Sequence, residues 1–398
     1  MAAVAAVVVG FVLHGSSGSL TSPDKSVVAP AAPDSDTVAW SEPLPEGWWP
    51  ASVSCDGQLV ALRREYPADL VMVGPCRDVG QAAVARRWQV WKDGAAPVFS
   101  PTAREAAVLT ERVPQPGPEA FGALEIRSLD ANGVVSGVRR WRLPKLFRDA
   151  DCGVEWSPDG SRLAVWADTN WSGDRAGMVP ESAIFVYRSD GRLLKKLEAG
   201  SPHGVRWSPD GGKLLYGAVS GHAVEDGDLA SVDLATGKFY PPWDGPGRGG
   251  GDYSPTWPCV DGWWLDAETV VGANEPGLFT ANWRDMAAVF VPQTKDHYLI
   301  DVECAGPDGA HLVTMDGNRL TADLVALRRD EQGRWRRSVL ASAPVAAFTR
   351  SKYGSLEAWA RWIPGRRGSL VAFDRQRRLV RGPAEKVWAA LAEGTKAP

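Results

Sequence analysis

The chain has 398 residues, of which 44% are hydrophobic and 23% are charged, a composition ample for a packed core. Its net charge of −4 argues against a protein whose main task is to hold nucleic acid phosphates. With 42 Gly and 30 Pro, no long helical apolar pattern, and short Val, Leu, Trp and Tyr runs between turns, the sequence predicts an all-β protein.

The first segment, residues 1–36, combines an apolar run with a linker. Ala2 to Leu13 are twelve consecutive apolar residues, followed by Gly/Ser and Pro/Ala/Asp/Ser stretches to about Asp36. Twelve residues are too few to span a bilayer, which takes about 20, but suit the core of a secretion signal. Because the first basic residue is Lys25, we expect that a start codon set too far downstream has trimmed a longer signal or membrane anchor. The expected location is therefore extracytoplasmic, secreted or anchored.

The five cysteines have no zinc-site spacing. Cys55 and Cys76 fall in one repeat and could form a disulfide in an oxidising compartment. The interpretation favoured for Cys152, Cys259 and Cys304 is small buried residues on inner strands.

Two segments of the chain are near copies of each other. Val154-Glu-Trp-Ser-Pro-Asp-Gly160 and Val205-Arg-Trp-Ser-Pro-Asp-Gly211 each lead into an apolar strand. In each, a strand ends at the Trp, Pro sets φ for a tight turn, and Asp-Gly supplies a positive φ. Five weaker versions share this layout, so that the turn residues stand at positions 57, 103, 160, 211, 262, 309 and 354.

The spacing of these seven turns is close to 50 residues, which matches one four-stranded blade per repeat. A second turn supports this in three repeats, at Asp130 to Gly133, Ser189 to Gly191 and Ala235 to Gly237. The sequence therefore predicts a single β-propeller of about seven blades, with six as the alternative.

The Trp-Ser-Pro-Asp-Gly turn followed by an apolar strand resembles the signature repeat of the TolB-like, WD-repeat-like propellers. The resemblance covers most of Trp48 to Arg381, with two strong repeats and five in outline. It implies an envelope protein that binds partner proteins. The family also forms the non-catalytic half of prolyl oligopeptidases, but fewer than 20 residues follow the last repeat and no Gly-x-Ser-x-Gly elbow occurs.

The ends of the propeller have specific expectations. We assign residues 37–382 to the propeller and 383–398 to a short outer helix and tail. A ring of blades leaves no open edge only if its last blade borrows a strand. We expect Thr37 to Trp40, or the segment around Trp48, to complete the blade formed by Gly354 to Val380.

The loops expected on the face opposite the repeated turns are long and varied, and binding residues concentrate on such loops. They are Arg64 to Arg86, Ala167 to Glu181, Ser220 to Asp228, Gly245 to Tyr253 and Thr294 to Tyr298. The candidate ligand- or partner-binding residues aimed at the funnel are Asp151, Trp171, Asp174, Arg175, His203, Asp252, Tyr253 and His297. For any single one, a solvated loop residue is the simpler interpretation.

No catalytic, metal or cofactor motif is present: Gly245 to Gly251 lacks the Lys-Ser/Thr of a P-loop, and the five histidines lack ligand spacing. Three hypotheses follow. The first is a non-enzymatic extracytoplasmic module that docks a protein, peptide or envelope glycan. The second is a propeller lyase or glycosidase with two axial carboxylates, and the third is a membrane-tethered structural or sensor domain.

Overall fold

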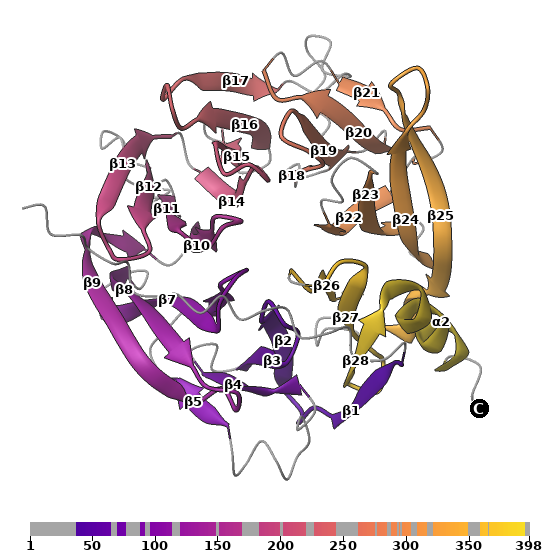
Figure 1. Cartoon of the computed structure of the whole chain (residues 1–398), viewed down its shortest axis with the longest axis horizontal. Helices are drawn as coiled ribbons and strands as arrows, with labels where there is room; N and C mark the ends of the chain where they lie inside the picture. Colours follow the sequence, from indigo (N-terminus) through magenta and orange to yellow (C-terminus); the bar gives the residue numbers. More distant parts are fainter. Residues whose placement is uncertain are drawn as a thin grey trace, which may run out of the picture.

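In the computed structural model, the short apolar runs form strands, and these strands pair into seven four-stranded antiparallel sheets around a central axis (Figure 1). The predicted β-propeller is confirmed with seven blades, which excludes the six-bladed alternative. The structure describes residues 37–64, 70–76, 88–91, 96–113, 120–148, 151–168, 183–199, 202–219, 227–243, 262–274, 277–284, 288–292, 294, 297–303, 309–316, 321–348, 359–364 and 366–394.

Each blade has four strands, the first nearest the axis and the fourth outermost. The first four blades are β2 (Trp48–Val53), β3 (Leu59–Arg64), β4 (Val71–Pro75) and β5 (Gln89–Trp91); β6 (Val98–Phe99), β7 (Glu105–Val113), β8 (Ala120–Leu129) and β9 (Val135–Arg148); β10 (Asp151–Trp156), β11 (Arg162–Asp168), β12 (Ala183–Arg188) and β13 (Leu193–Glu198); and β14 (Pro202–Trp207), β15 (Lys213–Val219), β16 (Gly227–Asp233) and β17 (Phe239–Trp243). The last three are β18 (Gly262–Trp264), β19 (Thr269–Asn274), β20 (Gly277–Asn282) and β21 (Ala288–Phe290); β22 (His297–Glu303), β23 (Ala310–Asp316), β24 (Thr321–Arg329) and β25 (Trp335–Pro344); and β26 (Ala360–Trp362), β27 (Ser369–Phe373), β28 (Arg378–Pro383) and β1 (Ala39–Pro43). A 3-10 turn, η3 (Val345–Ala347), follows β25.

The core of the ring lies between the blades. Successive residues of a strand face opposite sides, so each blade buries both faces. In β11, Leu163 and Val165 pack against blade 2, whereas Ala164 packs against blade 4. Among the described residues, one apolar cluster occupies each of the seven junctions between neighbouring blades. The rigidity of the ring follows from this repeated packing.

A tryptophan ends the inner strand of blades 3, 4 and 5 and joins each blade to the one before it. The indole nitrogens of Trp156, Trp207 and Trp264 donate to the main-chain oxygens of Val98, Glu155 and Arg206, at 2.9, 3.1 and 3.3 Å. These tryptophans also pack in the apolar clusters between neighbouring blades.

The repeated turn is held by a serine that is fully buried. Ser157 Oγ donates to Asp159 Oδ1 (2.6 Å) and accepts from the Arg162 amide (2.9 Å), and Ser54 and Ser208 make the same pair of bonds. Gly57, Gly160 and Gly211 all have a φ of +67°, the left-handed region that glycine enters without strain. The turn is therefore one structural unit used three times.

Two of the seven predicted turns were misplaced. Gly262 lies within the inner strand β18, and the turn of blade 5 follows Trp264, where the Leu265 amide donates to the Thr269 carbonyl. The first two strands of blade 7 are joined between Ile363 and Ser369, so Gly354, which lies outside the described residues, is not the residue that joins them. Both blades lack the Ser-Pro-Asp-Gly sequence, and a nearby Gly was the only local signal.

The predicted loop from Arg64 to Arg86 was also wrong in part, because it contains β4 (Val71–Pro75), the third strand of blade 1. Strand β4 is buried along its whole length, as expected for a strand covered on both faces.

The ring is closed by β1, which pairs with β28 and supplies the outer strand of blade 7, as the prediction for Thr37 to Trp40 required (Figure 1). Arg377 fastens this seam: its guanidinium donates to the main-chain oxygens of Pro45 (2.9 Å) and Trp48 (2.7 Å). The same guanidinium lies over the Trp49 ring. Closure thus joins residues more than 300 positions apart.

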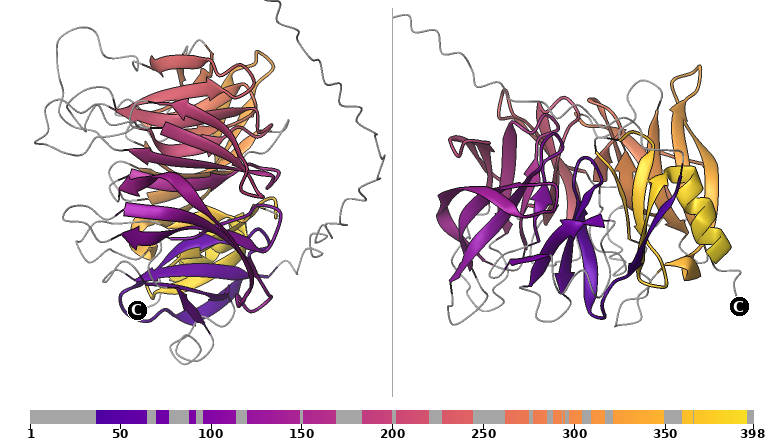
Figure 2. Two further views of the ribbon diagram at one scale, coloured as in Figure 1. Left: turned by 90° about the vertical axis from the view of Figure 1, so that its left-hand side faces the viewer. Right: turned by 60° about the horizontal axis from the view of Figure 1, so that its bottom comes forward.

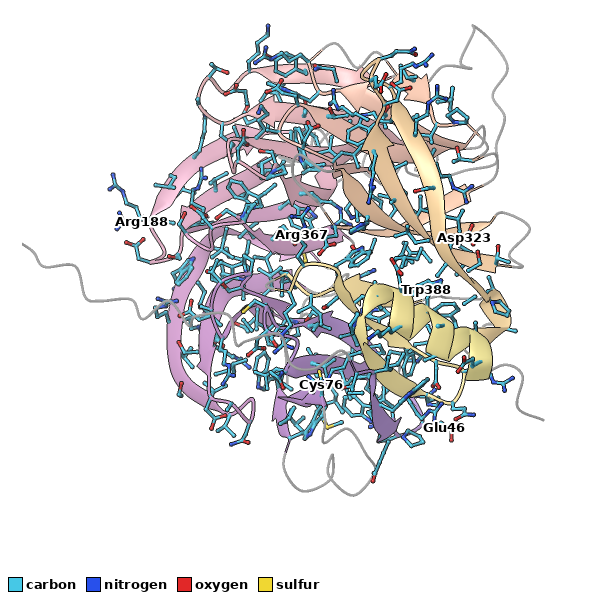
Figure 3. The ribbon with its side chains drawn as sticks, turned by 45° about the vertical axis from the view of Figure 1, so that its right-hand side comes forward. Glu46, Cys76, Arg188, Asp323, Arg367 and Trp388 are labelled. Carbon is cyan, nitrogen blue, oxygen red and sulfur yellow. The ribbon has the colours of Figure 1, made fainter. Side chains whose placement is uncertain are left out.

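Helix α2 (Ala384–Gly394) packs outside the ring against β25, β27 and β28 (Figure 2). Trp388, labelled in Figure 3, is fully buried beneath the helix and donates to the Ala322 carbonyl at 2.9 Å. In the described part of the chain, no helix has the length and apolarity needed to cross a membrane. The run from Ala2 to Leu13 lies outside the described residues.

Cys55 and Cys76 are both free thiols, so they do not form a disulfide with each other. The Cys55 sulfur contacts the Ala103 carbonyl of blade 2 at 3.8 Å. Burial raises the pKa of the Cys76 thiol to about 12. Cys152 lies on the inner strand β10, partly buried, as expected for a small core residue.

Candidate functional site

The residues that the sequence predicted for the funnel divide into two groups. Asp151, His203 and His297 lie at or near the beginnings of the inner strands β10, β14 and β22, and so share one end of the axis. The structure describes their backbone but not their side chains. The other predicted residues lie outside the described ranges: Trp171, Asp174, Arg175, Asp252 and Tyr253. All eight remain predictions.

Deeper along the same strands, one residue from each blade occupies an equivalent position. Each of these seven residues pairs with a buried residue in the second strand of its blade. In each inner strand the next residue is apolar. We call this set the axial belt, and it consists of Ser52, Val98, Glu155, Arg206, Trp263, Asp301 and Arg361. Because Asp151 and Glu155 are four residues apart in β10, their backbone positions are ~13 Å apart along that strand.

The axial belt holds four charged residues. They form two neighbouring pairs of opposite charge, Glu155 with Arg206 on blades 3 and 4, and Asp301 with Arg361 on blades 6 and 7. All four are partly exposed, although they lie on the innermost strands of the ring (Figure 1). Charged side chains that are largely buried usually have hydrogen-bond or ion-pair partners. The partners of each of these four residues therefore indicate whether its role is structural or whether it is available to a ligand.

Asp301 and Arg361 are bonded within the ring. Asp301 Oδ2 accepts from the Trp362 amide at 2.9 Å, and Arg361 Nη1 donates to the carbonyls of Ile300 and Ala360, both at 3.0 Å. These bonds connect blade 6 to blade 7. Burial raises the pKa of Asp301, while Arg361 and the Trp362 amide oppose that shift. This pair has a structural role at the junction.

Glu155 and Arg206 are different. Among the described residues, the Glu155 carboxyl makes no hydrogen bond, the Arg206 guanidinium makes none, and no ion pair within 4.0 Å joins them. The guanidinium lies over the Trp263 ring, 4.4 Å from its centroid. The Trp263 indole nitrogen is buried and has no hydrogen-bond partner in that part of the chain. The Glu155 carboxyl and the Arg206 guanidinium therefore retain hydrogen-bonding capacity on the inner strands of blades 3 and 4.

The pKa of Glu155 is raised to about 7. Burial is the main cause, and the charge of Asp301 adds to it, whereas Arg206 and Arg361 lower the pKa. Near neutral pH this carboxyl therefore exists in both forms and can either donate or accept a hydrogen bond. A carboxyl that titrates near pH 7 beside an arginine is typical of functional sites.

Sequence reasoning missed the axial belt, although part of the signal was present. Both strong repeats read Val-x-Trp-Ser-Pro-Asp-Gly, and the variable residue is Glu155 in one and Arg206 in the other. Asp301 and Arg361 carried no such signal, because their blades lack the motif and residue Ile300 forms a bulge that shifts the register of β22.

The described residues include no group of three or more His, Cys, Asp and Glu side chains placed to hold a metal ion. The chemistry that the belt offers is ionic and hydrogen-bonding: one guanidinium that packs on a buried indole ring, and one carboxyl that titrates near neutrality.

Comparison with known proteins places the fold. No protein-family model matches the sequence, and no curated protein matches it. Among solved structures, the chain is similar to a component of a mitotic checkpoint complex, at 11% identity over 94% of this chain and 98% of the other, with a TM-score of 0.52. It is similar to a chain of the outer coat vertex of COPII on membranes, at 10% identity over 86% and 84%, with a TM-score of 0.51. A putative TolB from Agrobacterium tumefaciens aligns at 19% identity over 65% and 86%, with a TM-score of 0.36. At these identities the likeness concerns the propeller fold alone.

Proposed function

We propose that this chain is a non-enzymatic binding module that works outside the cytoplasm and docks a protein, peptide or other envelope ligand at the axis of its ring. The observation that carries the proposal is the unbonded pair Glu155 and Arg206 in the axial belt. A rigid scaffold with a few convergent polar groups beside an aromatic surface is the usual form of a binding site.

Two further facts support a binding role. The checkpoint and COPII proteins that share the fold belong, by their names, to assemblies, which favours a binding role by analogy of fold. The predicted signal or anchor segment, Ala2 to Leu13, supports the location outside the cytoplasm.

The binding proposal is tested by chemical cross-linking of the full chain in a cell-envelope fraction, followed by identification of the captured species. Wild-type protein is expected to capture a specific set, and the double variant Glu155→Gln, Arg206→Met is expected to lose it. Glu198→Gln, Arg336→Met serves as the matched control, because both residues are exposed on outermost strands. If wild type and the control captured nothing above background, the proposal would be wrong.

The location is tested separately, by fusing the full chain to a reporter enzyme that is active only outside the cytoplasm. Activity that depends on the presence of residues 1–36 is the expected result. An inactive fusion that is stably produced would contradict the extracytoplasmic assignment. An active fusion that remains in the membrane fraction would indicate the tethered form.

One observation favours a second candidate, a lyase or glycosidase on the axis. Glu155 and Asp301 are two carboxyl groups of the same belt, and the first has a pKa of about 7, as a general acid requires. Asp301 is, however, bonded to the Trp362 amide, and Arg361 donates only to main-chain carbonyls. Turnover of an envelope glycan that is abolished in Glu155→Gln would decide for this candidate.

A further inference from the structure

We propose that Glu155 and Arg206, whose guanidinium lies over the Trp263 ring, form a site for the carboxylate of a peptide. The inference rests on the proposed binding function and specifies the ligand that the axial belt takes. Nothing else among the described side chains presents an unbonded guanidinium and an unbonded carboxyl from neighbouring inner strands at the same register.

The two side chains start from fixed backbone positions. The Glu155 carbonyl accepts the Trp207 indole N–H at 3.1 Å, and the Arg206 carbonyl accepts that of Trp264 at 3.3 Å. Glu155 lies in a regular ladder opposite Ala164, and Arg206 pairs with Leu215 directly after a bulge in β14. Because the backbone of both residues is already fixed, little conformational entropy is lost when a ligand binds, which favours affinity.

The position of the Arg206 guanidinium favours an anion in its plane. One face of the group rests on Trp263, so its in-plane N–H groups are the ones that a ligand can reach. A planar fork of N–H donors matches a carboxylate with two parallel hydrogen bonds.

Glu155 supplies the second contact. In its protonated form it donates a hydrogen bond to the ligand carboxylate, and in its ionised form it repels that carboxylate. The described charges that act on Glu155 are Arg206 from β14, Asp301 from β22 and Arg361 from β26. A bound anion stabilises the protonated form, so binding takes up a proton and the affinity falls as the pH rises above about 7.

The neutral members of the belt indicate why the carboxylate belongs to a peptide. Val98, which is partly exposed, and Trp263, which is buried, flank the charged pair, and the Ser52 hydroxyl lies farther around the ring, donating to the Pro97 carbonyl. A chain that continues from its carboxylate can therefore contact apolar and polar groups in turn.

The test is calorimetric titration of the full chain with three acetylated tripeptides: Ala-Ala-Ala as the free acid, the same peptide as its C-terminal amide, and Ala-Asp-Ala amide. Comparison of the first and third peptides distinguishes recognition of a terminal carboxylate from recognition of a side-chain carboxylate. We expect at least one of them to bind ten times more tightly than the Ala-Ala-Ala amide, and more weakly at pH 8.5 than at pH 6. Equal binding of all three, or no binding tighter than about 1 mM, would overturn the proposal.

Variants assign the binding to the site. Arg206→Met is expected to lose at least tenfold in affinity, and Arg206→Lys to recover part of it, since lysine keeps the charge but not the fork. Glu155→Gln is expected to remove the pH dependence. Arg336→Met, on the exposed outer strand, should bind as wild type. Envelope capture that persists in Arg206→Met would leave the proposed function standing and refute this site.

Discussion

The replacement Glu155→Gln is expected to stabilise the protein at high pH and to leave it unchanged at low pH. The folded-state pKa of about 7 lies above the ordinary value of 4.5, so folding binds this proton more tightly than the unfolded chain does. Stability is therefore lost as the pH rises from about 4.5 to about 7, and stays lost above it. At 1.36 kcal/mol per pKa unit the difference corresponds to about 3 kcal/mol, and partial exposure of Glu155 reduces the expected gain to ~1–3 kcal/mol.

The assay is urea unfolding of wild type and variant at pH 5 and pH 8. The expected result is a small advantage of the Glu155→Gln protein at pH 5, which lies just above the ordinary pKa of 4.5, and a larger advantage at pH 8. Glu198→Gln is the control, because the Glu198 side chain is 86% exposed on β13 and should give the same difference at both pH values. A Glu155→Gln difference that did not change between the two pH values would refute the argument that burial controls this carboxyl.

The remaining predictions concern the structural repeat and the cysteines. Trp207→Phe should lower the free energy of unfolding by ~2–4 kcal/mol in urea, because a buried carbonyl loses its donor and a smaller ring leaves a gap, whereas Trp40→Phe on the exposed outer strand should change it by less than ~0.5 kcal/mol. Ser208→Ala should cost ~1–3 kcal/mol in the same assay, because the buried Lys213 amide loses its acceptor; an unchanged midpoint would contradict the role given to the turn. Cys76 should resist iodoacetamide in the folded protein and react after unfolding, by mass spectrometry, since its thiol is buried with a pKa of about 12.

The propeller could be predicted because one turn carries its own chemistry in the sequence. Ser157, Asp159 and Gly160 are each required by a bond or a φ value that the structure contains, and the same requirement recurs at Ser208. Blades 5 and 7 turn without this unit: main-chain bonds are joined there by one side-chain acceptor each, Asp266 for the Glu268 amide and Glu303 for the Gly368 amide. Their turns could not be located, because neither has the serine, aspartate and glycine at the spacing that marks the repeated turn.

The site was less predictable for a different reason. The candidate loop residues were selected by polarity and loop length, but the axial belt lies inside strands, where the sequence shows only one polar residue between two apolar ones. Glu155 is informative only beside Arg206 in an aligned repeat, and the two become a site only when the ring brings their blades together. Long-range closure of this kind is set by topology, which a local pattern does not contain.

The bonds that hold the blades together also position the axial belt. Each repeat tryptophan donates to the carbonyl of a belt residue in the preceding blade, so Val98, Glu155 and Arg206 are fixed by the blade that follows them. An unbonded carboxyl can therefore remain on an inner strand for two reasons. The apolar packing between blades offsets the free-energy cost of its burial, and the fixed backbone of Glu155 cannot move to expose it. Loss of the Trp207 bond should therefore loosen Glu155 as well as the junction, and the pKa of Glu155 should fall toward its ordinary value.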